Sequence, residues 1–371
     1  MKKFLDCISI VGATPSKFHG TKKYVSTGAV ATTEIDESEV VEVTYEDRPS
    51  RANLSAEAGD ILFAKMQGTR KTLLLDSETE ENIYSTGFYA VRANPEVITT
   101  ECLYYLIDSE LFLAQKDKNC SGATQKAITN GGMAKIEISV PALSEQGILV
   151  NKLKHLTQLI ADKKKQLNLF DEIIKSRFIE MFGDPKRNPR KWDMVTIGDI
   201  ATDVRYGTSR PATEGGKYPY LRMNNLTYEG YLDLTDLKHI DIPDNEVEKC
   251  VVRNGDVLFN RTNSVELVGK TCVYNLDSDM IIAGYIIRVR IDDRVLPVIL
   301  SSYLNSTVMK EQLRSMAKGA VNQANINAQE LRSIPIYLPP ITLQHEFATF
   351  VEQVDKSKFY IVQMQILLRL L

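Results

Sequence analysis

Residues that would mark a metal site or a disulfide framework are scarce in this sequence. Its 371 residues include five cysteines and four histidines, with no Cys-x-x-Cys pair and no histidine close to a cysteine. We therefore expect neither a structural zinc site nor a set of disulfides, and the cysteine usage fits a reducing cytoplasm.

Long apolar runs and a leader segment are also lacking. No apolar stretch approaches the roughly 20 residues that span a bilayer. The start, MKKFLDCISIVGAT, carries basic residues before an apolar stretch, but Asp6 interrupts that stretch. We therefore expect no export signal and no membrane partner.

Motifs of a nucleotide-dependent enzyme are missing as well. The string SVELVGKT at 264–271 ends like a phosphate loop, but Ser264 stands where the first glycine is required. The strings NPRK at 188–191 and LPPI at 338–341 are the nearest to the Asn/Asp-Pro-Pro-aromatic loop of adenine methyltransferases. Both fit a turn or the boundary of a helix. We expect no catalytic residue and no cofactor in this chain.

The overall charge gives no sign of a nucleic-acid binder. Charged residues make up 25% and hydrophobic residues 43%, which is ordinary for folded domains, and the length suggests two of them. The net charge is -3 and the pI is near 6.0. Affinity for DNA follows local clusters of Lys and Arg, however, so this balance does not exclude DNA as a partner.

The sequence contains one domain written twice. A shift of 196 residues places GDILF at 59–63 on GDVLF at 255–259. A shift of 197 places Gly122-Ala123 on Gly319-Ala320, and a shift of 198 places Pro141 on Pro339 and Gln146 on Gln344. Because the offset drifts by so little over such a length, we infer two tandem copies.

Each copy predicts an α+β domain that ends in a long helix. Short β-type runs broken by Gly, Asn and Asp come first, with one helical stretch among them. A helix then follows PALSEQ in the first copy and PPITLQ in the second. In both helices apolar residues follow the alternating spacing of a coiled-coil seam, with isolated polar exceptions. The seam positions are Leu149, Leu153, Leu156, Ile160, Lys163, Leu167, Phe170, Ile174 and Arg177, and then Phe347, Phe350, Val354, Ser357, Ile361, Met364, Leu368 and Leu371.

The central helix, about 144–182, predicts how the copies are arranged. It ends at Phe182-Gly183-Asp184-Pro185, a stop signal of Gly followed by Pro. At about 1.5 Å per residue it would hold the copies about 55–60 Å apart. The second helix starts at its far end, so pairing requires an antiparallel coiled coil. The alternative is that each apolar stripe packs only on its own domain.

The order domain, helix, domain, helix is similar to a known family. The helix end LFDEIIKSRFIEMFGDP, the string FVEQVDKSKF and the GDILF/GDVLF and ISVP/IYLP landmarks resemble the DNA-specificity subunit of Type I restriction-modification systems over essentially the whole chain. The resemblance implies target-recognition domains at 1–143 and 184–341, a central spacer helix at 144–183 and a shortened C-terminal spacer helix at 342–371. The second helix is shorter than the first, which departs from the family.

The resemblance also implies partners and cofactors. Each target-recognition domain would read one half of a bipartite site in double-stranded DNA, and the helices would dock two methyltransferase subunits that use S-adenosylmethionine to methylate adenine. A motor-nuclease (restriction) subunit that uses ATP and magnesium joins some of these complexes. This chain itself would be non-catalytic.

Candidate DNA contacts are polar side chains in loops that follow the same landmarks in both copies. Base reading needs paired donors and acceptors, so Asn and Gln are expected on bases and Lys and Arg chiefly on phosphates. For any one residue, an exposed polar side chain without a ligand is an equally good interpretation. The candidates are Lys17, Lys22, Lys23, Lys65, Gln67, Thr69, Arg70, Lys71, Thr124, Gln125 and Lys126 in the first copy, and Arg205, Tyr206, Thr208, Arg210, Arg222, Asn224, Asn225, Arg261, Asn263, Asn322, Gln323 and Asn325 in the second.

Other interpretations of the same residues remain. Glu57, Asp60 and Lys65 could form a nuclease site, but the second copy has Arg253 in place of Glu57, so a turn and strand is favoured. His155 and His345 lack ligand-spaced partners and are expected in solvent. At the level of the chain, the alternatives to a DNA reader are a coiled-coil adaptor whose end domains bind proteins, and a self-sufficient enzyme.

Overall fold

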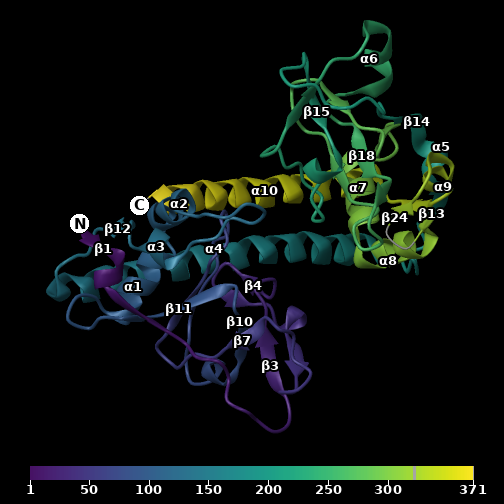
Figure 1. Cartoon of the computed structure of the whole chain (residues 1–371). Helices are drawn as coiled ribbons and strands as arrows, with labels where there is room; N and C mark the ends of the chain where they lie inside the picture. Colours follow the sequence, from purple (N-terminus) through teal and green to yellow (C-terminus); the bar gives the residue numbers. More distant parts are fainter. Residues whose placement is uncertain (321–322, 371) are drawn as a thin grey trace. The chain divides into compact units, whose positions relative to one another are not determined.

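The computed structural model describes residues 1–320 and 323–370, with side chains left out at 318–320, 323 and 365–370. The predicted contact Asn322 lies outside the described residues, as do Leu371 and the side chains of Gln323 and Leu368. The chain forms two compact units, Met1–Leu159 and Ile160–Leu371. Both units are mixed α/β (Figure 1).

The first unit contains two four-stranded sheets. One has the order β6 (Val41–Val43), β3 (Lys22–Val25), β10 (Ile83–Ser85), β7 (Ala52–Leu54). The other has the order β2 (Ile8–Val11), β11 (Phe88–Ala93), β8 (Ile61–Ala64), β9 (Thr72–Leu74). The short pairs are β1 (Lys2–Lys3) with β12 (Glu137–Ile138) and β4 (Val30–Ala31) with β5 (Glu34–Ile35). The helices are η1 (Phe4–Asp6), η2 (Glu37–Glu39), η3 (Thr79–Glu81), α1 (Thr100–Ile107), α2 (Glu110–Lys118), α3 (Asn130–Met133) and the start of α4 (Leu143–Phe182).

The second unit repeats this plan. Its sheets have the orders β16 (Lys238–Ile240), β15 (Tyr218–Leu221), β21 (Met280–Ile282), β17 (Val251–Val252), and β14 (Ala201–Tyr206), β22 (Ile286–Ile291), β18 (Val257–Asn260), β20 (Thr271–Val273). Smaller sheets are β13 (Asp193–Thr196) with β25 (Pro335–Leu338), and β19 (Thr262–Asn263), β24 (Gln323–Asn325), β23 (Lys318–Ala320). The helices are α5 (Ile197–Ile200), η4 (Met223–Asn225), α6 (Asp244–Cys250), α7 (Pro297–Asn305), α8 (Thr307–Met316), α9 (Ala328–Arg332) and α10 (Ile341–Leu370).

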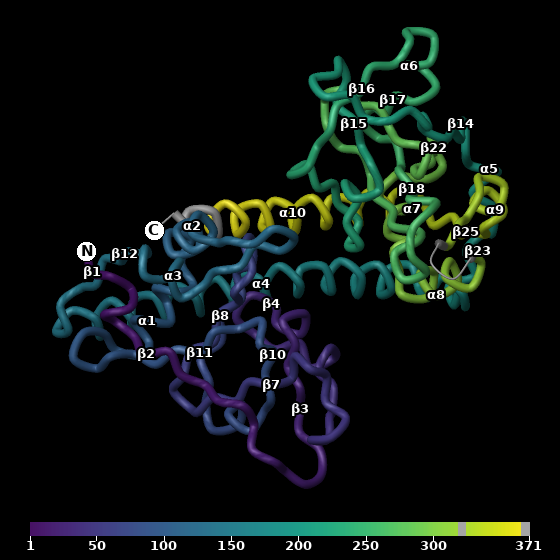
Figure 2. Tube along the Cα trace, viewed as in Figure 1, coloured from purple at the N-terminus to yellow at the C-terminus, as the bar shows by residue number. Residues whose placement is uncertain are grey.

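The two units share one topology, as the repeat in the sequence predicted. In each unit the first sheet contains one parallel pair, β3 with β10 and β15 with β21, among antiparallel neighbours. The strand of the repeated GD-Ile/Val-LF motif, β8 or β18, lies inside the other sheet and is fully buried. A helix packs against that strand in each unit, α1 on β8 and α7 on β18 (Figure 2).

One buried glutamine fastens each terminal helix to its unit with the same hydrogen bonds. The side chain of Gln146 accepts from the Thr99 N–H at 2.8 Å and donates to the carbonyls of Val97 and Pro141, both at 3.0 Å. In the second unit, Gln344 accepts from the Leu296 N–H at 2.9 Å and donates to the carbonyls of Arg294 and Pro339. Both side chains are fully buried. These hydrogen bonds fix the angle at which each helix enters its unit.

Replacing Gln344 with alanine is expected to lower the free energy of unfolding of the second unit by about 2–3 kcal/mol, because one N–H and two carbonyls lose their partner in a buried place. The sole tryptophan, Trp192, belongs to this unit, so its fluorescence during urea unfolding reports the loss. The exposed Gln353→Ala change in the same helix is the control. Equal stability of both variants would contradict the assigned role.

The central helix ends where its stop signal predicts. Helix α4 ends at Phe182, and Gly183 has a φ of +88°, which favours glycine. A Cβ atom at this position would lie 2.6 Å from the Pro189 ring. The Gly183 carbonyl accepts from the hydroxyl of Tyr337 at 3.0 Å, so the chain turns directly into the core of the second unit.

Within the second unit, α10 runs antiparallel to the last part of α4 (Figure 1). The Phe347 ring lies 5.5 Å from the rings of both Phe178 and Phe182. Farther along, the Lys358 ammonium pairs with Asp171 and donates to the Tyr231 hydroxyl at 2.7 Å. The two helices and the loop that carries Tyr231 are thereby fixed in one register.

The predicted seam positions differ in exposure. Those that are buried are Phe347, Val354 and Ile361. Those that are partly buried are Leu153, Leu156, Ile160, Lys163, Leu167, Phe170, Ile174, Arg177 and Phe350. Leu149 and Met364 are exposed at 38% and 40%, and Ser357 is exposed as well. The burial pattern therefore follows the predicted stripe, and the seam residues at its ends, Leu149 and Met364, are exposed.

Candidate nucleic-acid interface

Two of the predicted loops of the first unit lie together. The loop after β8, residues 65–71, contacts the segment 121–127 through a bridge between Met66 and Ala127. The Gln67 N–H donates to the Lys126 carbonyl at 3.0 Å. We call these two segments surface 1. The candidates Thr124, Gln125 and Lys126 are exposed on it.

The second unit builds the same arrangement from the same landmarks. The segment after β18 forms β19, which pairs with β24, with Thr262 opposite Asn325 and Asn263 opposite Ala324. The Thr262 hydroxyl donates to the Asn325 side chain at 3.0 Å. We call residues 261–263 and 323–325 surface 2. The predicted candidates that follow GDILF and GDVLF thus meet those that follow the repeated Gly-Ala in both units.

A cation on a tyrosine ring occupies the start of each surface. The Lys65 ammonium lies 4.3 Å from the Tyr89 ring centre, and the Arg261 guanidinium lies 4.9 Å from that of Tyr206. Lys65 also donates to the carbonyl of Thr86, two residues before β11, at 2.9 Å. Arg261 donates to the carbonyl of Gly284, two residues before β22, at 3.5 Å. Burial lowers the pKa of Lys65. Ring and carbonyl hold each cation in place while part of it stays accessible.

Arg261 retains hydrogen-bonding capacity. Its Nε–H is buried and has no hydrogen-bond partner within the described part of the chain. The Nη1 bond to Gly284 is long, at 3.5 Å. Arg261 is partly exposed, so the outer part of its guanidinium is free to meet guanine or a phosphate.

Other predicted arginines are paired with carboxylates. Arg70 donates to Asp108 at 2.9 and 3.1 Å and to Glu110 at 2.8 Å. Arg210 binds Glu246 through two bonds, at 2.8 and 3.0 Å, and these hydrogen bonds raise the pKa of Arg210. The remaining pairs are Arg205 with Asp203, Arg222 with Asp236, Lys17 with Glu46, Lys22 with Glu81 and Lys23 with Glu37. Most of these pairs are exposed, so breaking one for a phosphate costs little.

Several candidates are used inside the fold. Asn225 is 2% exposed, accepts from the Arg222 N–H and donates to the Asp233 carbonyl. Thr208 is buried and its hydroxyl accepts from the Arg210 N–H at 3.2 Å.

The other candidates divide between internal bonds and open surface. The amine of Lys71 donates to the Thr27 carbonyl at 2.6 Å. The Gln67 amide donates to the Asp117 carbonyl at 3.3 Å, and the Asn263 amide donates to Asn260 at 2.8 Å. Thr69 is partly buried within surface 1, whereas Asn224 is exposed at η4.

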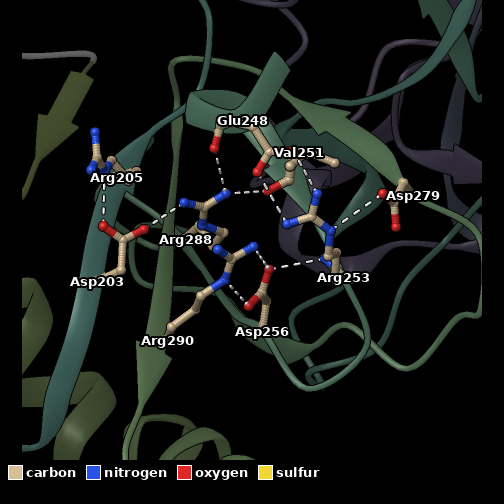
Figure 3. A network of polar contacts seen from close by, with 9 residues as sticks. All are labelled: Asp203, Arg205, Glu248, Val251, Arg253, Asp256, Asp279, Arg288 and Arg290. Carbon is tan, nitrogen blue, oxygen red and sulfur yellow. Dashed lines mark hydrogen bonds and ion pairs between the residues drawn. The ribbon is translucent and has the colours of Figure 1, made fainter. Parts of the chain in front are cut away.

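The carboxylates that could suggest a nuclease are structural. Asp60 is 1% exposed, accepts from the Glu57 N–H and pairs with Arg92 at 2.6 Å. Asp256 repeats this with Arg253 and Arg290 in the second unit (Figure 3). Each closes a turn and ties it to the neighbouring strand, which supports the turn-and-strand interpretation. Among the described residues no group of three His, Cys, Asp or Glu side chains could hold a metal ion.

Sequence reasoning missed some residues that hold the loops of the two surfaces. Tyr89 was not selected, although it directly follows Gly87-Phe88, which a shift of 197 residues places on Gly284-Tyr285. The buried amines of Lys116 and Lys310 were also missed. A lysine on the apolar face of a short helix was their only signal. No helix within the described ranges is both long and apolar enough to cross a membrane.

Comparison with known proteins gives consistent matches. Residues 10–169 and 189–370 each match the model of the Type I restriction modification DNA specificity domain. The Type I restriction enzyme EcoKI specificity subunit of Escherichia coli K12 is 23% identical over 313 residues, covering 79% of this chain and 67% of the relative. A putative type I restriction enzyme MjaX specificity subunit of Methanocaldococcus jannaschii is 28% identical over 171 residues, 45% of this chain and 40% of that one. The chain thus spans between two fifths and two thirds of these relatives.

Solved structures share the fold. A chain from a study of complex assembly and conformational transition of the type I R-M system superposes with a TM-score of 0.56 at 22% identity, covering 98% of this chain and 95% of that chain. The S subunit of a Type-I restriction-modification system from M. genitalium gives a TM-score of 0.50 at 12% identity, covering 100% and 92%. At these identities the likeness concerns the fold alone.

Proposed function

Because the chain belongs to the Type I restriction modification DNA specificity domain family, we propose that it is the DNA-recognition subunit of such a system and performs no chemistry itself. Each unit reads one half of a bipartite site in duplex DNA. Helices α4 and α10 pair as an antiparallel coiled coil and set the unread gap between the halves.

The observation that carries this proposal is the repetition of one surface in two units. Lys65 on Tyr89 and Arg261 on Tyr206 each begin a two-segment surface that follows the same buried strand. A protein with two copies of one polar surface suits a target with two parts. Since the side chains on the two surfaces differ, the two half-sites differ in sequence.

The chemistry belongs to partner subunits. We propose that two methyltransferase subunits assemble on this chain and methylate an adenine in each half-site with S-adenosylmethionine. A restriction subunit that uses ATP and magnesium joins them where the system also cleaves DNA. The names of the relatives support this assignment.

Mapping of methylated adenines across the genome of the source cell tests the proposal. With the chain present, we expect one bipartite motif with a methylated adenine in each half, and deletion of the gene should remove that motif alone. An unchanged methylation map would refute the role in DNA recognition. A motif without an internal gap would refute the two-part reading.

Replacing Arg261 with alanine is expected to weaken recognition of one half-site by about 1–3 kcal/mol, because a base-edge or phosphate contact is lost there. The measurement is the Kd of the assembled methyltransferase complex on duplexes with one altered half-site. Relaxed preference at one base pair indicates base reading, and uniform weakening with a smaller salt slope indicates a phosphate contact.

Arg253→Ala is the matched control for this experiment. Arg253 lies before β18, whereas Arg261 follows it, so the control removes the same charge at the opposite end of one strand. Arg253 is also exposed, at 43%, and paired with Glu248. Equal effects of the two substitutions would argue against surface 2 as the reading surface.

A further inference from the structure

A buried lysine holds the backbone of the loop in surface 1. Lys116, in α2, is 2% exposed, and its ammonium donates to the carbonyls of Ala64, Met66 and Thr69 at 3.3, 2.9 and 2.7 Å. The next residue, Asp117, accepts from the Gly68 N–H at 3.0 Å. The end of helix α2 thus fixes the backbone of the loop between β8 and β9 from the protein interior. The other face of this loop forms part of surface 1.

The second unit has a buried lysine in the same role. Lys310, in α8, is 4% exposed and donates to the Gly269 carbonyl at 3.2 Å, at the end of the loop between β18 and β20. Its ammonium also lies 4.7 Å from the Tyr228 ring.

These two lysines are not at matching sequence positions. Lys310 is four residues after the N-cap Ser306, and Lys116 is seven after the N-cap Ser109. Since a helical turn takes about 3.6 residues, both project from the same helix face one turn apart. Lysines at different sequence positions therefore place an ammonium against the equivalent loop in each unit.

A second lysine in each unit ties the same loop to its neighbour. Lys71 and Lys270 both precede a strand that starts with threonine, and they donate to the carbonyls of Thr27 and Met223 at 2.6 and 2.8 Å. Each of those carbonyls stands two residues after the end of the equivalent strand, β3 or β15. In the first unit the two lysines hold the loop at both ends, whereas in the second unit both hold it at the end that precedes β20.

Stability alone does not account for a buried ammonium. Removing the charge from water costs several kcal/mol, and an apolar residue of similar volume packs at lower cost. Burial lowers the pKa of Lys116, and burial together with neighbouring cations lowers the pKa of Lys310 to about 7. What the amine supplies, and an apolar side chain does not, is a set of donors for the carbonyls of this loop.

We propose that Lys116 and Lys310 are positioning residues for sequence recognition, one for each half-site, which set the shape of the reading loop without touching DNA. This inference rests on the proposed function, since it concerns how surfaces 1 and 2 discriminate bases. Lys65 and Arg261 extend from the same loops, so a displaced loop backbone moves the cation that each surface presents.

Methionine substitutions test the inference in the assembled methyltransferase complex. We expect Lys116→Met to reduce discrimination between cognate and altered duplex about tenfold at the half-site read by the first unit only, a loss of the size of one mismatched base pair. Lys310→Met should do the same at the other half-site. Affinity for random duplex should stay unchanged, and Lys118→Met, an exposed lysine in α2, should change nothing.

A pH series provides a readout that needs no variant to fold. Lys270, Arg314 and Lys175 face Lys310 and disfavour its charged form, and Glu229 opposes them. Because the folded pKa is below that of the unfolded chain, the unfolded chain binds more protons above pH 7, and stability rises with pH there. Discrimination at the second half-site should fall over the same range, because a neutral amine donates weaker hydrogen bonds.

The outcomes separate the two claims. If the wild-type complex fails to discriminate cognate from random duplex at any pH, the proposed function is wrong. If it discriminates, but both methionine variants keep full discrimination and the wild type shows no fall above pH 7 at the second half-site, the positioning role is wrong. Equal weakening on cognate and random duplex by a folded variant would also overturn it.

Discussion

Replacing Arg288 with methionine is expected to lower the free energy of unfolding of the second unit by about 2–3 kcal/mol, because the Val251 carbonyl loses a charged donor and Asp203 loses one of its two cations. Arg288, in β22, is 1% exposed, and its side chain lies between Asp203 of β14 and Val251 of β17 (Figure 3). Its guanidinium pairs with Asp203 and donates to the Val251 carbonyl. Methionine fills the volume but leaves that carbonyl without its donor.

Urea unfolding followed by Trp192 fluorescence measures this loss, and Arg205→Met is its control. Arg205 pairs with the same carboxylate at 2.8 Å but is 53% exposed, so its removal should cost less than about 1 kcal/mol. If the two substitutions cost the same, the buried pair contributes no more than a surface pair does.

The effect should also depend on pH. Burial raises the pKa of Asp203, but the hydrogen bonds from Arg205 and Arg288 outweigh it and leave that pKa below its usual value. A carboxylate with a lowered folded pKa contributes stability above its unfolded pKa and loses it as the pH falls through the folded one. The difference between wild type and Arg288→Met should therefore shrink below about pH 4.

The fold could be predicted well from the sequence where local patterns decide it. The stop at Gly183 requires a positive φ and a following proline, and both are readable from the residue types. The repeat was readable because the landmarks occupy buried strands and caps, such as Gln146 and Gln344, whose bonds recur in both units.

Pairing between strands that are distant in the sequence was harder to predict. The pairing of β19 with β24, which builds surface 2, joins residues about 60 apart in the sequence. No short-range pattern specifies that register.

The candidate site could be predicted by loop but not by side chain. The loops after GDILF and Gly122, which the sequence singled out for their polar side chains, meet in space, and their contact with DNA stays a prediction. Which guanidinium is already paired depends on tertiary neighbours, as Arg70 with Asp108 shows. Lys116 was missed because its partners are backbone carbonyls, which the residue types of the loop do not reveal.

Exchange of the reading part of the second unit is expected to replace one half of the methylated motif completely and to leave the other half and the gap unchanged. The exchange should cover residues 197–334, because these cuts lie at the ends of the β13–β25 pair. The Ile197 N–H donates to the Ile334 carbonyl at 2.9 Å, so the two cut points lie side by side and one donor segment can close there.

These cut points also keep the attachment of β25 to the helices, whereas Tyr231, which contacts Asp171 and Lys358, is exchanged with the graft. Tyr337, in β25, stacks on Phe178 and binds the Gly183 carbonyl, and both contacts stay with the recipient. Donor segments must supply a residue equivalent to Leu296, whose N–H binds Gln344, or the helix entry angle changes with the graft. Methylation mapping of the hybrid shows the outcome. A new sequence in both halves would mean that the two units do not read DNA independently. The helices fix the register and the exchanged surface belongs to one unit, so this graft should not alter the other half-site.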